Sequence, residues 1–101
     1  MMIRHIVMVK FKAGVSEEKI AEVQEGLGSL PDLIPEIESY EFGRDIARSE
    51  RSHDFALVSM FADMEALQKY MMHPDHQKVA GMLKEISADI RVADYEIDYQ
   101  F

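Results

Sequence analysis

Two segments of the chain carry apolar side chains on both of their alternating faces. In residues 3–12 one face holds Ile3, His5, Val7, Val9 and Phe11, and the other includes Ile6 and Met8. In residues 53–61 one face holds Phe55, Leu57, Ser59 and Phe61, and the other Ala56, Val58 and Met60. A strand that is apolar on both sides needs cover on both sides, so we interpret these segments as the central strands of a sheet.

A helical pattern follows the first strand. Ser16 is a good N-cap, and acidic residues come directly after it, where the helix dipole favours negative charge. Apolar residues then recur at spacings of three, four and three: Ile20, Val23, Leu27 and Leu30. Pro31 and Pro35 are predicted to close this helix.

Two more helical patterns meet at Pro74. The first is capped by Asp63 and is predicted to point Met64, Leu67, Tyr70 and Met71 inward. Proline ends a helix but suits the first position of a new one. In the helical pattern after Pro74, the apolar face carries His76, Val79, Ala80, Leu83 and Ile86. His76 is therefore predicted to lie on the apolar side of its helix.

The remaining segments have weaker patterns. Residues 36–45 are predicted to form an edge strand, and residues 46–52 a charged loop. Residues 90–99 alternate sharply, with Tyr95, Ile97 and Tyr99 opposing Asp94, Glu96 and Asp98, and are predicted to form a second edge strand.

The order strand, helix, strand, strand, two helices, strand predicts an α+β fold. It matches the ferredoxin-like split βαβ arrangement, with a four-stranded antiparallel sheet in a single domain of residues 1–101. That topology places the helices on one face only. The other face would expose Ile6, Met8, Ala56, Val58 and Met60. A patch of several hundred Å² normally marks an interface, so we predict a homodimer packed sheet against sheet.

Composition narrows the classes of partner. The net charge of −8, from 11 basic and 19 acidic residues, disfavours nucleic acid. The chain has no cysteine, which excludes disulfides and thiolate chemistry. No apolar run has the length of a membrane span, and the N-terminus lacks the order of a signal peptide, so the expected location is cytoplasmic with no membrane partner.

Three polar side chains are predicted to project into an apolar cleft between the sheet and the helices. We expect His76 to be the general base, Tyr70 the hydrogen-bond donor and His5 a positioning group. The predicted lining is apolar: Val7, Val9, Val23, Leu27, Leu57, Val79 and Ala80. The alternative is that Tyr70, His76 and His5 are core residues with satisfied polar atoms.

His73 and His76 invite a metal interpretation, but Pro74 breaks the helix that would align their rings. A helix-capping role fits His73 better, and neither a metal nor a cofactor is predicted.

Several stretches together resemble one known family, the stress-responsive α/β-barrel (Dabb) domain. They are Ile3-Arg4-His5-Ile6-Val7-Met8-Val9-Lys10-Phe11-Lys12, Ile34-Pro35-Glu36-Ile37, Phe42-Gly43-Arg44, Phe55-Ala56-Leu57-Val58, Tyr70-Met71-Met72-His73-Pro74-Asp75-His76 and Asp94-Tyr95-Glu96. The resemblance implies a ferredoxin-like fold and a dimer whose two sheets form a barrel.

The resemblance also bears on chemistry. Some family members are linked to stress tolerance, and a few act on polyketides through a tyrosine and a histidine placed like Tyr70 and His76, with a strand histidine like His5. Those cyclases carry a further histidine where this chain has Phe55. Some relatives hold a hard cation on loop carbonyls, here around Pro31, Ile34 and Ile37.

Three functions remain open at this stage. The first is a stress-associated protein that binds a small apolar or carbonyl ligand, and the second a polyketide cyclase-like or lyase-like enzyme that uses acid–base catalysis. The third is a structural or chaperone-like oligomer whose cleft is filled with side chains.

Overall fold

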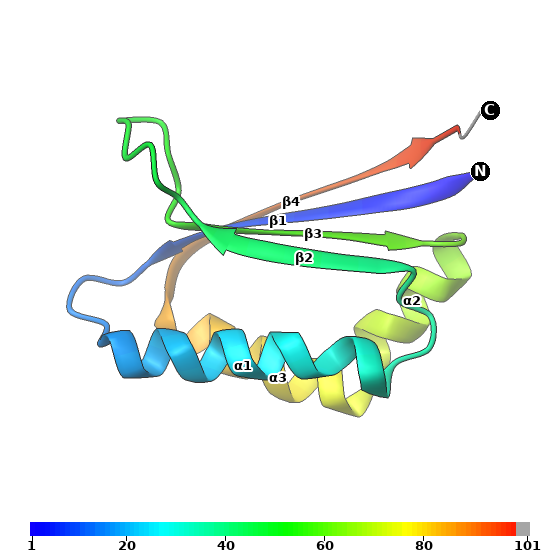
Figure 1. Ribbon diagram of the computed structural model, residues 1–101, viewed down its shortest axis with the longest axis horizontal. Coiled ribbons are helices and arrows are strands. Elements are labelled where there is room, and N and C mark those ends of the chain that lie inside the picture. Colours follow the sequence, from blue (N-terminus) through cyan, green and yellow to red (C-terminus); the bar gives the residue numbers. More distant parts are fainter. Residues whose placement is uncertain (99–101) are drawn as a thin grey trace.

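The computed structural model describes residues 1–98 and shows a four-stranded antiparallel sheet with its helices on one face (Figure 1). The elements are β1 (Met2–Phe11), α1 (Glu17–Leu33), β2 (Ser39–Arg44), β3 (Phe55–Phe61), α2 (Met64–Met72), α3 (Pro74–Ile86) and β4 (Ser87–Ile97). The strands lie in the order β2-β3-β1-β4, so β1 and β3 are central. The predicted ferredoxin-like α+β fold is confirmed.

Helix α1 continues past the proline that was predicted to close it. Pro31 lies inside the last turn, and the helix ends only at Leu33. Leu30 and Ile34 flank this proline and are both 0 % exposed. Burying these two side chains outweighs the backbone hydrogen bond that proline cannot donate. Within residues 1–98 no helix is long and apolar enough to cross a membrane.

The segment after α1 is internally bonded. Ile34 precedes Pro35 and is extended, as the proline ring requires. The Ile34 carbonyl accepts a hydrogen bond from the Ile37 N–H at 3.2 Å. Of the three positions considered for a cation, Ile34 and Ile37 are therefore joined to each other by a backbone hydrogen bond.

Strand β4 begins three residues earlier than predicted. It follows α3 directly at Ser87, whose hydroxyl donates to the Leu83 carbonyl at 2.5 Å and caps the helix. The pairing with β1 shifts between Lys10 and Phe11, which absorbs one extra residue of β4. The predicted end of this strand at Tyr99 lies outside the described residues. Strand β2 is shorter at both ends than its pattern suggested, and β3 begins two residues later but ends at Phe61 as predicted.

The core lies between the sheet and the helices. Val9, Leu30, Ile34 and Phe61 are each 0 % exposed there. Helices α1 and α3 approach closely at Gly26, where a Cβ atom would lie 3.2 Å from a methyl group of Val79. Any larger residue at position 26 would therefore press on α3.

Helix α2 buries a narrower stripe than its pattern predicted. Leu67 and Tyr70 are buried, whereas Met64 is 50 % and Met71 44 % exposed. The helix has only nine residues, so just its central stripe reaches the sheet. The inward placement of Met64 was wrong, and Met71 lies at the edge of the cavity described below.

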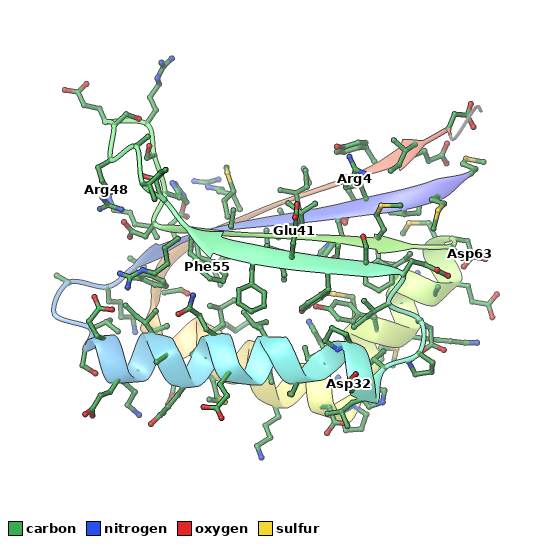
Figure 2. The ribbon with its side chains drawn as sticks, in the orientation of Figure 1. Arg4, Asp32, Glu41, Arg48, Phe55 and Asp63 are labelled. Carbon is green, nitrogen blue, oxygen red and sulfur yellow. The ribbon has the colours of Figure 1, made fainter. Side chains whose placement is uncertain are left out.

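The face of the sheet away from the helices carries apolar side chains beside a few charged ones and is only partly covered. Met8 is 43 % and Tyr95 44 % exposed. Arg4 and Glu41 project from this face (Figure 2). Met60, which was predicted to be exposed, is only 9 % exposed because an Arg4 nitrogen lies 3.4 Å from its sulfur. We refer to this surface as the open face.

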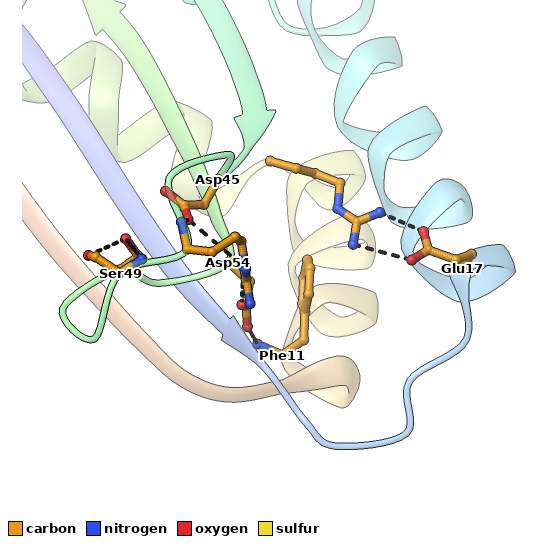
Figure 3. A network of polar contacts seen from close by, with 8 residues as sticks. Phe11, Glu17, Asp45, Ser49 and Asp54 are labelled. Atoms are coloured by element: carbon orange, nitrogen blue, oxygen red, sulfur yellow. Dashed lines mark hydrogen bonds and ion pairs between the residues drawn. The ribbon is translucent and has the colours of Figure 1, made fainter.

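The β2–β3 loop, residues 45–54, is held by ionic contacts (Figure 3). Arg48 has a positive φ of 52°, and its N–H donates to the Asp45 carboxylate at 2.7 Å. Its guanidinium donates to Asp54 at 2.8 Å, and the other Asp54 oxygen accepts the Phe11 N–H at 2.8 Å. These bonds lower the pKa of Asp54, with the Phe11 N–H as the largest cause.

Candidate functional site

A cavity of about 170 Å³ lies between the sheet and the α2–α3 junction. All seven helices and strands except β2 contribute to its wall. The lining residues are His5, Val7, Leu27, Leu57, Tyr70, Met71, His76, Ala80, Leu83, Lys84, Ile90 and Val92. Most of them are apolar, so the few polar side chains in the wall, which are His5, Tyr70, His76 and Lys84, determine which ligand atoms could be bound.

The structure brings the three predicted polar residues together at the cavity. It places only some of the predicted apolar residues there. His5, Tyr70 and His76 all line the cavity, with four of the predicted apolar residues: Val7, Leu27, Leu57 and Ala80. Val9, Val23 and Val79 lie in the core instead, at 0 %, 4 % and 6 % exposure. Val9 pairs with Phe55, farther along the sheet, and Val79 packs on Gly26.

The pattern analysis missed the contribution of β4. Ile90 and Val92 line the cavity because they pair with Val9 and Val7 of β1 and share their face. Tyr95, which alternates with these residues, therefore faces the open side. The alternation of this strand was visible in the sequence, but its register against β1 was not.

Asp94 is a polar site residue that the sequence analysis did not single out. It stands opposite His5 in the β1–β4 pairing, and its carboxylate is hydrogen-bonded to His5 Nδ1. His5 is 4 % exposed. A carboxylate at Nδ1 fixes the orientation of the imidazole ring and leaves Nε2 as its other polar atom.

The turn at Pro74 places Tyr70 and His76 in contact. Tyr70 lies in the last turn of α2 and His76 in the first turn of α3, with ring centroids 4.3 Å apart. His73 joins the helices, and its Nδ1 accepts the Asp75 N–H at 3.1 Å. It is thus a cap, as predicted: its ring caps the start of α3, and its backbone N–H caps the end of α2 by donating to the Tyr70 carbonyl at 3.2 Å.

His76 is held as a neutral base. Its Nδ1 is 3.1 Å from the Met71 carbonyl oxygen, which can only accept, so Nδ1 carries the proton. Burial lowers the pKa of His76, the Met71 carbonyl opposes this, and the positive forms of His5 and His73 lower it further. Nε2 is then left with a free lone pair.

The Tyr70 hydroxyl is held as a proton donor. Tyr70 is 1 % exposed, and its oxygen lies 2.7 Å from the hydroxyl of Tyr40 on β2. Burial raises the pKa of Tyr70 to about 12, although the hydrogen bond with Tyr40 acts in the other direction. At neutral pH the cavity wall therefore contains one protonated phenol beside one unprotonated imidazole nitrogen.

Phe55, the position at which the family resemblance implied a departure from the cyclases, lies in the core. Its ring is 3 % exposed and packs against Phe42 and Phe11, at centroid distances of 5.8 and 6.2 Å. It does not line the cavity. Position 55 therefore contributes no polar group to the cavity.

A larger hollow of about 520 Å³ lies on the open face, beneath the β2–β3 loop. It is shallow, and its His53 is already paired with Asp89 at 2.8 Å. The smaller cavity is the better candidate site, because it is apolar and combines a donor with a base.

We expect His76 to make stability depend on pH. A base whose pKa is lowered by folding is protonated more readily in the unfolded chain, so stability is lost as the pH falls below its ordinary value of 6.5. The loss is complete once the pH passes the lowered pKa. Urea unfolding at a series of pH values should show the stability of the wild type falling relative to that of His76→Gln on acidification. A constant difference between the two would contradict a half-buried His76 that stays neutral.

Comparison with known proteins places this geometry in a family. Residues 3–97 match the Stress responsive A/B Barrel Domain, Dabb. The stress-response A/B barrel domain-containing protein HS1 of Arabidopsis thaliana is 29% identical over 93% of this chain and 88% of its own length. Olivetolic acid cyclase of Cannabis sativa is 22% identical over 94% of this chain and 96% of its own length.

A solved structure agrees with these sequence matches. A dimeric ferredoxin-like protein of unknown function from Thermobifida fusca superimposes with a TM-score of 0.88 at 29% identity. The match covers 96% of this chain and 92% of that one. The chain described here therefore belongs to the stress-responsive A/B barrel (Dabb) family.

Proposed function

We propose that this protein is a homodimer, packed through its open faces, and that each subunit binds one small apolar molecule with a carbonyl oxygen. The dimer is supported by the exposed apolar side chains of the open face and by the dimeric state of the Thermobifida relative. The observation that carries the ligand proposal is the convergence of His5, Tyr70 and His76 on a single apolar cavity.

The cavity volume limits the size of the ligand. An engineered protein cavity of about 150 Å³ takes up benzene. At about 170 Å³ this cavity fits a molecule of one ring with a short substituent. An unfilled space of this size also counts against a purely structural role, in which side chains would fill the cleft.

The polar atoms select the chemistry of the ligand. The Tyr70 hydroxyl keeps its proton at neutral pH and can donate it to an acceptor atom of the ligand, such as a carbonyl oxygen. Apart from His5, His76 and Lys84 the remaining wall is apolar and favours a hydrocarbon body.

An acid–base enzyme is the second candidate, favoured by the neutral His76 beside a protonated Tyr70. Nε2 of His76 would take a proton from the carbon next to the carbonyl. The electrons of that C–H bond would move into a new C=C bond, and the oxygen would become an enolate stabilised by the Tyr70 O–H. The similarity to olivetolic acid cyclase supports this candidate, since ring closure of an aldol type begins with such a proton transfer.

Binding is tested with two probes of equal shape. Acetophenone has a carbonyl where α-methylstyrene has a C=CH₂ group. NMR titration should show both binding to the wild type, and Tyr70→Phe should bind acetophenone about three- to tenfold more weakly with no change for α-methylstyrene. Failure of the wild type to bind either probe would contradict the proposed function.

Catalysis is tested by exchange of the acetophenone methyl protons in D₂O. The wild type should accelerate the loss of the methyl signal, and His76→Gln should remove about 10²- to 10⁴-fold of that acceleration. His53→Gln, a change of the same kind outside the cavity, is the matched control. If acetophenone binds but the exchange of its methyl protons is not accelerated, the protein is a ligand-binding protein and the enzyme proposal is excluded.

A further inference from the structure

The Tyr70 hydroxyl has a partner outside the cavity wall. Tyr40 of β2 lies with its oxygen 2.7 Å from that of Tyr70, and the two rings are nearly edge to face at 66°. Tyr40 is not one of the cavity-lining residues, whereas Tyr70 is. The hydroxyl pair therefore connects the cavity wall to the edge strand.

The position of Tyr40 is set by its neighbours. Its ring packs edge to face on Phe42, two residues along the same strand face, with centroids 6.4 Å apart and planes at 80°. β2 is in turn paired with β3, where Tyr40 stands opposite Ser59. The Tyr40 oxygen is thus presented by a regular strand and not by a loop.

The direction of this hydrogen bond determines whether the Tyr70 proton is available to a ligand. Each phenol can donate one hydrogen bond and accept others. If Tyr70 donates to Tyr40, its only proton is used and none is left for a ligand. If Tyr40 donates to Tyr70, the Tyr70 oxygen is satisfied as an acceptor and its own proton is free to point into the cavity.

We propose that Tyr40 is a positioning residue that donates to Tyr70 and directs the Tyr70 proton toward an acceptor oxygen of the ligand. This inference rests on the proposed function of the cavity. Hydrogen bonds in a chain polarise one another, so a Tyr70 hydroxyl that accepts from Tyr40 is a stronger donor than an isolated one.

Burial keeps both hydroxyls of the pair protonated at neutral pH. It raises the pKa of Tyr70 to about 12, although the hydrogen bond with Tyr40 acts in the other direction. The pKa of Tyr40 itself is raised by burial first and then by Tyr70. Tyr40 therefore has a proton to donate at neutral pH, and the 2.7 Å contact lets it donate to the Tyr70 oxygen when charge develops there.

A double-mutant cycle tests the inference. Tyr40→Phe, Tyr70→Phe and the double variant are titrated with acetophenone and α-methylstyrene. We expect Tyr40→Phe to bind acetophenone about two- to fivefold more weakly, because the Tyr70 hydroxyl is no longer oriented and polarised. In the Tyr70→Phe background the same change should have no effect. α-Methylstyrene should bind all four proteins equally, since it accepts no comparable hydrogen bond.

The other outcomes separate the two proposals. Unchanged or tighter acetophenone binding by Tyr40→Phe, with weaker binding by Tyr70→Phe, would show that Tyr40 does not direct the proton, while the proposed function stands. Equal weakening for both probes would show lost packing and overturn the inference. No binding to the wild type would overturn both.

A second measurement uses the unsubstituted protein. With ¹³Cζ-labelled tyrosine, acetophenone should shift the signals of both Tyr70 and Tyr40, because the hydrogen bond to the ligand is transmitted through the pair. α-Methylstyrene should shift neither. A shift of Tyr70 alone with acetophenone would contradict the role of Tyr40.

Discussion

Val58→Asp is expected to convert the protein into a single 11.6 kDa species, whereas the wild type should have twice that mass. Val58 lies on the open face, paired with Ile6 on one side and Glu41 on the other. In a symmetric dimer the substitution occurs twice in one interface. Each new carboxylate would stand directly opposite Glu41 and lose its hydration in the interface, which costs more than the lost valine contact.

Sedimentation at several protein concentrations measures this effect. Ala21→Asp is the matched control, because it adds the same charge at an exposed position of α1, on the other side of the sheet. The circular dichroism of both variants should remain native, since Val58 is only partly buried within one subunit. A wild type that is monomeric at all concentrations, or a Val58→Asp variant that stays dimeric, would contradict packing through the open face.

Phe61→Ala is expected to cost about 3–5 kcal/mol of unfolding free energy. Phe61 is 0 % exposed at the end of β3, and its ring centroid lies 4.8 Å from that of Tyr70 and 6.4 Å from that of His5. Removing the ring would leave a cavity beneath Tyr70 and His5. The surrounding strands and helices are too rigid to close it. Ligand affinity should fall together with stability, because Tyr70 loses its packing partner.

Urea unfolding at one fixed protein concentration measures this cost, since a dimer's stability depends on concentration. Ile46→Ala is the control: the side chain is 94 % exposed in the β2–β3 loop, and its loss should change stability by less than about 0.5 kcal/mol. A cost below about 1 kcal/mol for Phe61→Ala would mean that the core closes over the missing ring.

Local patterns were sufficient to predict the helices and strands, and to predict that Tyr70 and His76 lie together in the site. The two-sided apolar strands identified β1 and β3 as central, because the period of a strand shows directly which faces are covered. Pro74 separated two helices and placed Tyr70 and His76 on either side of one turn, where their rings meet. These features depend on neighbours within about six residues along the chain.

Some local rules were overridden by packing. Pro31 and Pro35 were predicted to close α1, but the helix continues through Pro31 and ends at Leu33, where the buried Leu30 and Ile34 hold its last turn in the core. Met60 was predicted to be exposed, but Arg4 of the neighbouring strand covers it. In each case a side chain distant in sequence, or a core that many elements share, decided against the local preference.

By itself the sequence determined which residues form strands and helices, which faces are apolar and, through that, the α+β fold. Only the tertiary structure decided that Asp94 meets His5, that Tyr40 meets Tyr70, and that β4 lines the cavity while Val9, Val23 and Val79 do not. The reason is physical: periodicity fixes the direction in which a side chain points, but strand register and helix placement set how far along the sheet it lies.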